Sequence, residues 1–118
     1  MMKWLPWFIV GIVMASRAAC AAACSLQDIE VRQANWHREM ESYIRIVGEL
    51  YNGCSDAVGV ELQAVFRDKA GQVVTVMEFW PASTRNIAAK ETYAFSFLQS
   101  NEQPAAGMSI KIIDVKRW

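Results

Sequence analysis

Histidine is nearly absent from this chain, and so are the short motifs that mark nucleotide-binding and metal-binding sites. The 118 residues include one histidine and three cysteines. They contain no phosphate-binding glycine loop, no Cys-x-x-Cys pair and no metal-binding carboxylate loop. These absences remove the usual sequence evidence for catalysis, so we expect neither an enzyme nor a resident cofactor.

Neither sign of charge is in excess, since 12 Lys and Arg residues balance 12 Asp and Glu residues. This balance excludes a polybasic nucleic-acid binder, which needs surplus cations to neutralise phosphates. Apolar residues make up 53% of the chain and charged residues 20%, whereas disordered chains combine low hydrophobicity with high net charge. The chain is therefore expected to fold, and its length suits one domain.

No apolar run is long enough for a permanent membrane span, although a stretch near the N-terminus is almost wholly apolar. It extends from Trp4 to Ala15, follows Lys3 and precedes the small residues of Ala18–Cys24. A spanning helix needs about 20 apolar residues. The pattern instead indicates a cleavable signal peptide, with a positive start, an apolar centre and a small-residue cleavage zone.

Cleavage after Ala18 and cleavage after Ala23 both obey the rule of small residues at the cleavage site. We predict cleavage after Ala23, which makes residues 1–23 the signal peptide and residues 24–118 a single domain. The mature protein is then expected to be exported, either to a periplasm or to the extracellular space.

Export implies an oxidising environment, in which the remaining cysteines are expected to form a disulfide rather than a metal site or a nucleophile. Cleavage leaves Cys24 and Cys54. Closing a loop of this length stabilises a fold by about 3 to 4 kcal/mol in the chain-entropy model. The alternative is a membrane-associated lipoprotein acylated at Cys20 or Cys24. Such sites usually have an aliphatic residue three positions earlier, where Arg17 and Ala21 stand here.

Strands dominate the predicted domain, because apolar and polar residues alternate in segments that turn residues separate at spacings of about ten residues. The clearest segment is Val58–Arg67, in which every second residue from Val58 to Phe66 is apolar. The turn Asp68–Gly71 is short enough for an antiparallel hairpin. We predict an all-β antiparallel sandwich of about six or seven strands. The other expected strands are Asp28–His37, Tyr43–Tyr51, Gln72–Trp80, Thr92–Phe97 and the segment from Met108 onward.

The first two expected strands leave two questions open. Good helix formers give Gln33–Leu50 a helical alternative, although its aromatic and β-branched residues favour strands. Strict pairing of the two cysteines would set Val31 opposite Val47, whereas matching Ile29 to Leu50 shifts the register by one residue. A β-bulge, or cysteines just beyond the paired residues, would reconcile the two.

The last strand also changes phase. Met108, Ile110 and Ile112 alternate with other residues, but Ile113 and Val115 continue the stripe on the opposite face. This slip predicts a bulge near Ile112 or burial on both faces. The strand carries few charges, so at an uncovered sheet edge it would pair with a partner strand or a second copy. Inside a sheet it would need no partner.

The segments Val47–Asn52, Val58–Val60 and Val65–Val74 resemble the FxLYD domain family. That family has a strand ending in Gly-x-Val-x-Asn and a turn of the form aromatic-x-Asp-x-x-Gly followed by Val-Val. The resemblance extends over about Tyr43–Leu98 and implies an immunoglobulin-like β-sandwich in bacterial or archaeal envelope and secreted proteins, with no catalytic residues to carry over. The positions that carry it are Gly48, Asn52, Phe66, Asp68 and Gly71.

Together these observations predict an exported, non-catalytic envelope module for protein–protein interaction or assembly. The alternative is a periplasmic soft-metal protein that carries copper on His37 and Met40, with Met77 or Met108 as a further ligand. The tryptophans that follow the signal peptide serve either packing or an aromatic contact surface. They are Trp36, Trp80 and Trp118.

Overall fold

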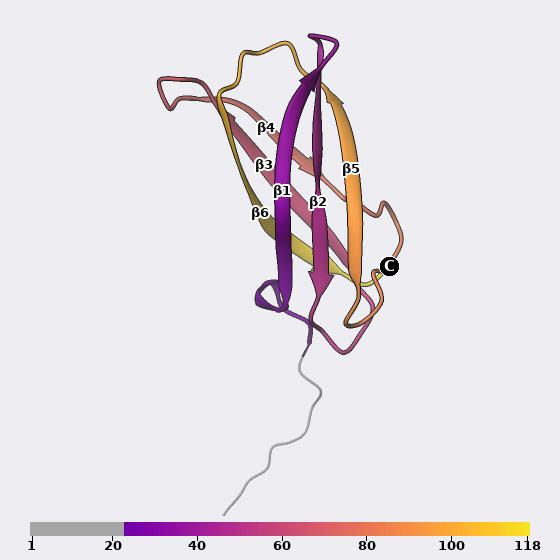
Figure 1. Ribbon diagram of the computed structural model, residues 1–118. Helices are drawn as coiled ribbons and strands as arrows, with labels where there is room; N and C mark the ends of the chain where they lie inside the picture. Colours follow the sequence, from indigo (N-terminus) through magenta and orange to yellow (C-terminus); the bar gives the residue numbers. More distant parts are fainter. Residues whose placement is uncertain (1–22) are drawn as a thin grey trace, which may run out of the picture.

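Two antiparallel sheets pack face to face in the computed structural model, which describes residues 23–118 (Figure 1). One sheet has the strand order β1-β2-β5 and the other β4-β3-β6. The predicted all-β antiparallel sandwich is thus confirmed, with six strands. The elements are η1 (Leu26–Asp28), β1 (Ile29–Glu39), β2 (Tyr43–Asn52), β3 (Gly59–Arg67), β4 (Val73–Phe79), β5 (Thr92–Ser100) and β6 (Gly107–Lys116).

The predicted signal peptide and a lipid on Cys20 lie outside the described residues, apart from Ala23 itself. Within residues 23–118, no helix has the length and apolar character needed to cross a membrane.

The core lies between the two central strands, β2 and β3. Their inward side chains follow the alternation expected of a half-buried strand, because successive residues point to opposite faces of a sheet. Those that are completely buried include Ile44, Ile46, Leu50, Leu62, Ala64 and Phe66. The helical alternative for Gln33–Leu50 is therefore wrong, since this segment contains most of β1, a turn and most of β2.

The pairing of β1 with β2 confirms the antiparallel hairpin but not its expected register. Val31 lies opposite Leu50 rather than Val47, and Ile29 lies opposite Asn52 rather than Leu50. The register then shifts by one residue between Arg32 and Asn35. The expected bulge is therefore present. The cysteines also lie beyond the paired residues, because η1 separates Cys24 from the start of β1. β1 also extends past His37 to Glu39.

Cys24 and Cys54 form the predicted disulfide, with their Cα atoms 5.5 Å apart. The bond connects the segment before η1 to the loop after β2. It is reinforced by the backbone of that loop, where the Gly53 N–H donates to the Asp28 carbonyl at 2.8 Å. The N-terminal end of the sandwich is therefore held covalently and by hydrogen bonds.

β6 lies at an edge of its sheet, with β3 as its neighbour. The predicted phase slip is a bulge: Asp114 pairs with Glu61 and Ile112 with Leu62, which leaves Ile113 as the extra residue. Of the two placements considered from the sequence, at a sheet edge or inside a sheet, β6 therefore has the edge position.

Candidate interaction site

The β6 edge is the side of β6 that faces away from β3, and among residues 23–118 no strand pairs with it. β3 has a neighbouring strand on both sides. Its inner-face residues, every second residue from Val60 to Phe66, are at most 2% exposed. Their counterparts on β6 pack against the core but are only partly buried. These half-covered residues are Met108, Ile110, Ile112 and Val115. The β6 edge thus combines free backbone groups with accessible apolar side chains.

The outer face of β6 is polar and carries both signs of charge. Lys111 lies opposite Gln63, and Asp114 lies opposite Glu61. Both residues of β6 are exposed, and within residues 23–118 neither takes part in an ion pair. Asp114 Oδ1 accepts a hydrogen bond from the Val115 N–H at 2.8 Å.

The chain leading into β6 is fixed by an arginine from the other sheet. The Arg38 guanidinium donates to the carbonyls of Asn101 and Gln103, each at 2.6 Å. Asn101 is buried, and its side chain accepts from the Gln103 N–H at 2.7 Å and donates to Thr75 Oγ1 at 3.1 Å. The loop between β5 and β6 is therefore held in place before β6 begins.

The end of β6 is fixed by the residue that follows it closely, Trp118. Its indole meets that of Trp80 edge to face, with ring centroids 5.1 Å apart, and the Lys116 ammonium lies 4.0 Å from the Trp118 ring centroid. The Trp118 N–H also donates to Asn86 Oδ1 at 3.0 Å. Gly59 leaves room for the indole, because a Cβ there would lie 2.7 Å from Trp118 Cδ1. Both ends of β6 are thus anchored. Among residues 23–118 no second strand pairs with β6, and β1 and η1 are the other elements that approach it.

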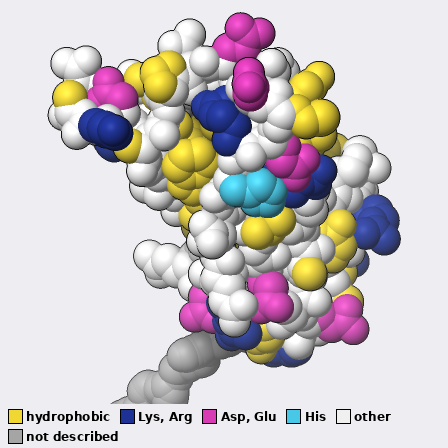
Figure 2. All heavy atoms as spheres, turned by 45° about the horizontal axis from the view of Figure 1, so that its top comes forward, with side chains coloured by type: hydrophobic (Ala, Val, Ile, Leu, Met, Phe, Trp, Pro, Cys, Tyr) yellow, Lys and Arg dark blue, Asp and Glu magenta, His cyan; other side chains and the backbone are white. Residues whose placement is uncertain are grey.

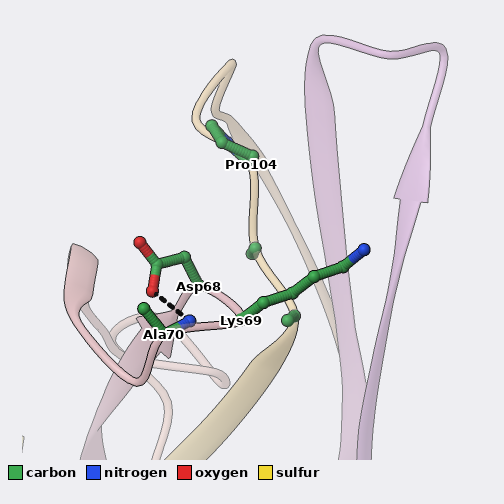
Figure 3. A pocket seen from close by; sticks show the side chains of 6 residues that line it. Asp68, Lys69, Ala70 and Pro104 are labelled. Atoms are coloured by element: carbon green, nitrogen blue, oxygen red, sulfur yellow. Dashed lines mark hydrogen bonds between the residues drawn. The ribbon is translucent and has the colours of Figure 1, made fainter.

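A hollow of about 380 Å³ lies where β6 begins, between the β3–β4 turn and the β5–β6 loop (Figure 3). Its lining is small and apolar apart from Asp68 and Lys69. In Figure 3 the Lys69 side chain extends away from Asp68, whose carboxylate bonds to the Ala70 N–H. The remaining lining residues are Pro104, Ala105 and Ala106.

Hydrophobic side chains also gather in a column between the projecting β3–β4 turn and the histidine (Figure 2). On this side of the sandwich β1 and β6 belong to different sheets and approach each other. Trp36 of β1 packs edge-on against Phe66, with ring centroids 5.3 Å apart, and remains partly exposed. Trp36 thus serves core packing while part of its side chain stays accessible.

The other sheet edges differ from β6 in their charges. On β1, Arg32 and Glu30 form an ion pair with each other, and the bulge includes Gln33 at φ 54°. The one charged residue of β4, Glu78, accepts a hydrogen bond from Gln63 at 3.0 Å. β5 has no charged residue. Among the strands described, β6 is therefore the edge that presents unpaired charges of both signs.

The residues that carry the FxLYD resemblance serve the fold. Asn52 is completely buried, and its Nδ2 donates to the carbonyls of Asp56 at 2.9 Å and Ile87 at 2.8 Å. Its Oδ1 accepts from the Cys54 N–H at 2.8 Å. This one side chain therefore connects the end of β2 to two loops. Phe66, the second-last residue of β3, is completely buried.

Asp68 and Gly71 build the β3–β4 turn. Asp68 Oδ1 accepts from the N–H groups of Ala70 and Gln72 at 2.9 and 3.0 Å. Gly71 adopts φ 85°, a conformation that a residue with a Cβ enters only with strain. The motif thus supplies turn chemistry.

His37 lies on the outer face of β1, where its Nε2 is 3.0 Å from Glu39 Oε2. Arg45 binds the same carboxylate and donates to Ser96 Oγ at 2.6 Å. The hydrogen bonds from Arg45, and then from His37, lower the pKa of Glu39, and the same contact with Glu39 raises the pKa of Arg45. The histidine thus lies within hydrogen-bonding distance of the carboxylate of a surface ion pair between Glu39 and Arg45.

The methionines proposed as copper ligands are scattered. Met40 lies in the β1–β2 turn and is 75% exposed, whereas Met77 is buried between the sheets. Met77, on β4, points into the core, whereas His37, on β1 of the other sheet, lies on the outer face. The two side chains therefore do not converge. Within residues 23–118, the one group of three possible metal ligands is Cys24, Asp28 and Cys54, in which both thiols belong to the disulfide.

Sequence reasoning missed the residues that fix the ends of β6. Arg38 and Asn101 both lie outside the strands expected from the sequence. Their role depends on contacts between distant segments, for which no local pattern exists. For Trp118 the sequence offered a signal, since it belongs to the mostly apolar segment that begins at Met108.

No protein-family model, curated protein or solved structure matches this chain.

Proposed function

We propose that this chain is an exported, non-catalytic module of the cell envelope that takes part in assembly by accepting an added strand along the β6 edge. The observation that carries the proposal is the position of β6. It is a ten-residue strand with one neighbour and with inward apolar residues that are only partly buried. An extended segment of another chain would pair with its free N–H and C=O groups and cover those side chains.

The strand order supports an immunoglobulin-like sandwich that has six strands instead of the usual seven. In an immunoglobulin sandwich one sheet contains the first, second and fifth strands, and the other contains strands C, F and G, with F between C and G. Here β1-β2-β5 matches strands A, B and E, and the pair β3-β6 matches C and F. β4, which lies beside β3, matches the C′ strand of variable domains rather than strand D of the first sheet. The position beside β6 is the one that strand G would occupy. The FxLYD resemblance supports the same plan.

The disulfide supports export. Such bonds persist in oxidising compartments and are rare in the cytosol. The Cys24–Cys54 bond joins residues 30 positions apart in a small sandwich, where a covalent bond has much to contribute.

Site-specific photo-cross-linking in the cells that naturally produce the protein tests this proposal. A photoreactive amino acid replaces Ser109, which is exposed on β6, and in a matched control it replaces Val76, which is 52% exposed on β4 of the same sheet. We expect a discrete adduct from position 109 and none from position 76. Equal adducts from both positions, or none from position 109, would contradict strand addition at β6.

A further inference from the structure

We propose that the strand received by the β6 edge is β6 of a second copy of this chain, paired antiparallel about a twofold axis that passes between Ile112 and Ile113. This inference rests on the proposed function, because it names the partner of the same edge. A twofold interface is self-complementary, so each contact occurs twice.

The register follows from the charges of the strand. With the axis between Ile112 and Ile113, Lys111 lies opposite Asp114 of the second copy. Ile110 then lies opposite Val115 of the second copy. Directly opposed residues of an antiparallel pair point to the same face of the sheet. Lys111 and Asp114 both stand on the outer face, and Ile110 and Val115 both stand on the inner face. Charge therefore meets opposite charge, and apolar residue meets apolar residue.

The bulge at Ile113 makes this match possible. In a regular strand, residues three positions apart point to opposite faces. Because Ile113 is an extra residue between Ile112 and Asp114, Lys111 and Asp114 share a face although they are three positions apart. Bulges commonly turn an edge away from pairing. At the centre of a twofold interface this bulge instead brings equivalent faces together.

Neighbouring registers fit less well. An axis moved by one residue toward the C-terminus would set Lys111 opposite Lys116 of the second copy. An axis moved by one residue toward the N-terminus would set Lys111 opposite Ile112 of the second copy, and so join an outer-face residue to an inner-face one. The charges of β6 therefore select one register among the closest alternatives.

The single chain also has an unbalanced charge at this place. Asp114 lies opposite Glu61 on the outer face, and like charges directly opposed destabilise a sheet. Lys111 of the second copy would lie on the other side of Asp114 and offset this repulsion. The β4, β5 and β1 edges lack such an unpaired complementary pair among the residues described.

Charge exchange tests the pairing. The chain is produced in a host that exports it, and its mass is measured by sedimentation velocity over a wide range of concentration, beside Lys111→Asp, Asp114→Lys and the double variant. We expect a wild-type dimer and a dissociation constant at least about tenfold weaker in each single variant, because two attractive pairs become repulsive. The double variant restores opposite charges and is expected to recover the dimer.

The stability of the Asp114→Lys variant serves as the control for folding. Asp114→Lys sets a cation opposite Glu61 within one chain, which offsets the loss of the hydrogen bond from the Val115 N–H to Asp114 Oδ1. Its fold is therefore expected to be close to the wild type in stability, as urea unfolding would show. A monomeric wild type, or a dimer that all three variants leave unchanged, would overturn self-pairing. A monomer that still forms an adduct from position 109 with a different protein would overturn self-pairing alone and leave the strand-addition proposal intact.

Discussion

Asp114 of β6 lies directly opposite Glu61 of β3, so two carboxylates occupy neighbouring positions on the outer face of one sheet. The pair lies directly beside the bulge at Ile113, and Asp114 is exposed. Their repulsion is small in water, but it lies at the strand edge where an additional cation would have most effect. The relationship connects the local electrostatics of the sheet to its proposed partner.

Replacing Asp114 by Asn is expected to stabilise the isolated chain by about 0.2 to 1 kcal/mol, because it removes the repulsion from Glu61. Asn retains the oxygen that accepts from the Val115 N–H. Urea unfolding at low protein concentration measures the effect. Asp56→Asn is the control, since that exposed carboxylate faces Arg117 at 3.8 Å instead of an acid. A loss of stability in Asp114→Asn would show that the carboxylate pair is not repulsive.

Asn52→Asp is expected to destabilise the fold by about 2 to 4 kcal/mol. The substitution keeps the size of the side chain but sets an oxygen against the carbonyls of Asp56 and Ile87, inside a site with no exposed surface. Chemical denaturation compares it with Asn35→Asp, in which the exposed side chain keeps the oxygen that accepts from the Trp36 N–H. If the two variants were equally stable, Asn52 would not organise the loops.

Removal of the disulfide by the double substitution Cys24→Ser and Cys54→Ser is expected to cost about 3 to 4 kcal/mol, because the unfolded chain regains the freedom of a loop with sequence separation 30. Thermal unfolding gives the difference, and the wild type with reductant should approach the variant. A wild type whose intact mass shows two alkylated thiols before reduction would lack the bond altogether.

Glu39 should make the fold sensitive to acid. Hydrogen bonds from Arg45 and His37 lower its pKa in the folded state, so its contribution is present above the unfolded value of about 4.3 and is lost as the pH falls through the lower folded value. Unfolding measured from neutral pH into this acid range should therefore vary less with pH in Glu39→Gln than in the wild type. Glu41→Gln, in the adjacent turn, serves as the control. A pH dependence unchanged in Glu39→Gln would remove this role.

The strands were predictable because alternation is a local property. Every second residue of Val58–Arg67 is apolar, and the structure buries that face in β3. The turn at Asp68 and Gly71 was equally visible, since both residues act within a few positions of themselves. The bulge at Ile113 could be anticipated from the change of phase in the sequence.

The register of β1 and β2 was beyond local reasoning because it depends on packing from a third strand. A Cβ on Gly48 would lie 3.0 Å from Cζ of Phe95 and 3.2 Å from Cα of Ala34, so the glycine admits both the aromatic ring and the bulged strand. The edge position of β6 has a similar cause, since its pairing with β3 joins segments far apart in the sequence. Long-range partners therefore set both the register and the candidate site.

Amide hydrogen exchange along β6, followed at low and high protein concentration, tests the central claim most directly. An edge strand leaves part of its N–H groups open to solvent, and an added strand bonds to them. We predict that amides within Ser109–Lys116 exchange rapidly in dilute protein and become protected on concentration, while those of β4 and β5 stay unchanged. Exchange in β6 that is independent of concentration, or that changes equally at every sheet edge, would contradict pairing of β6 with a second copy.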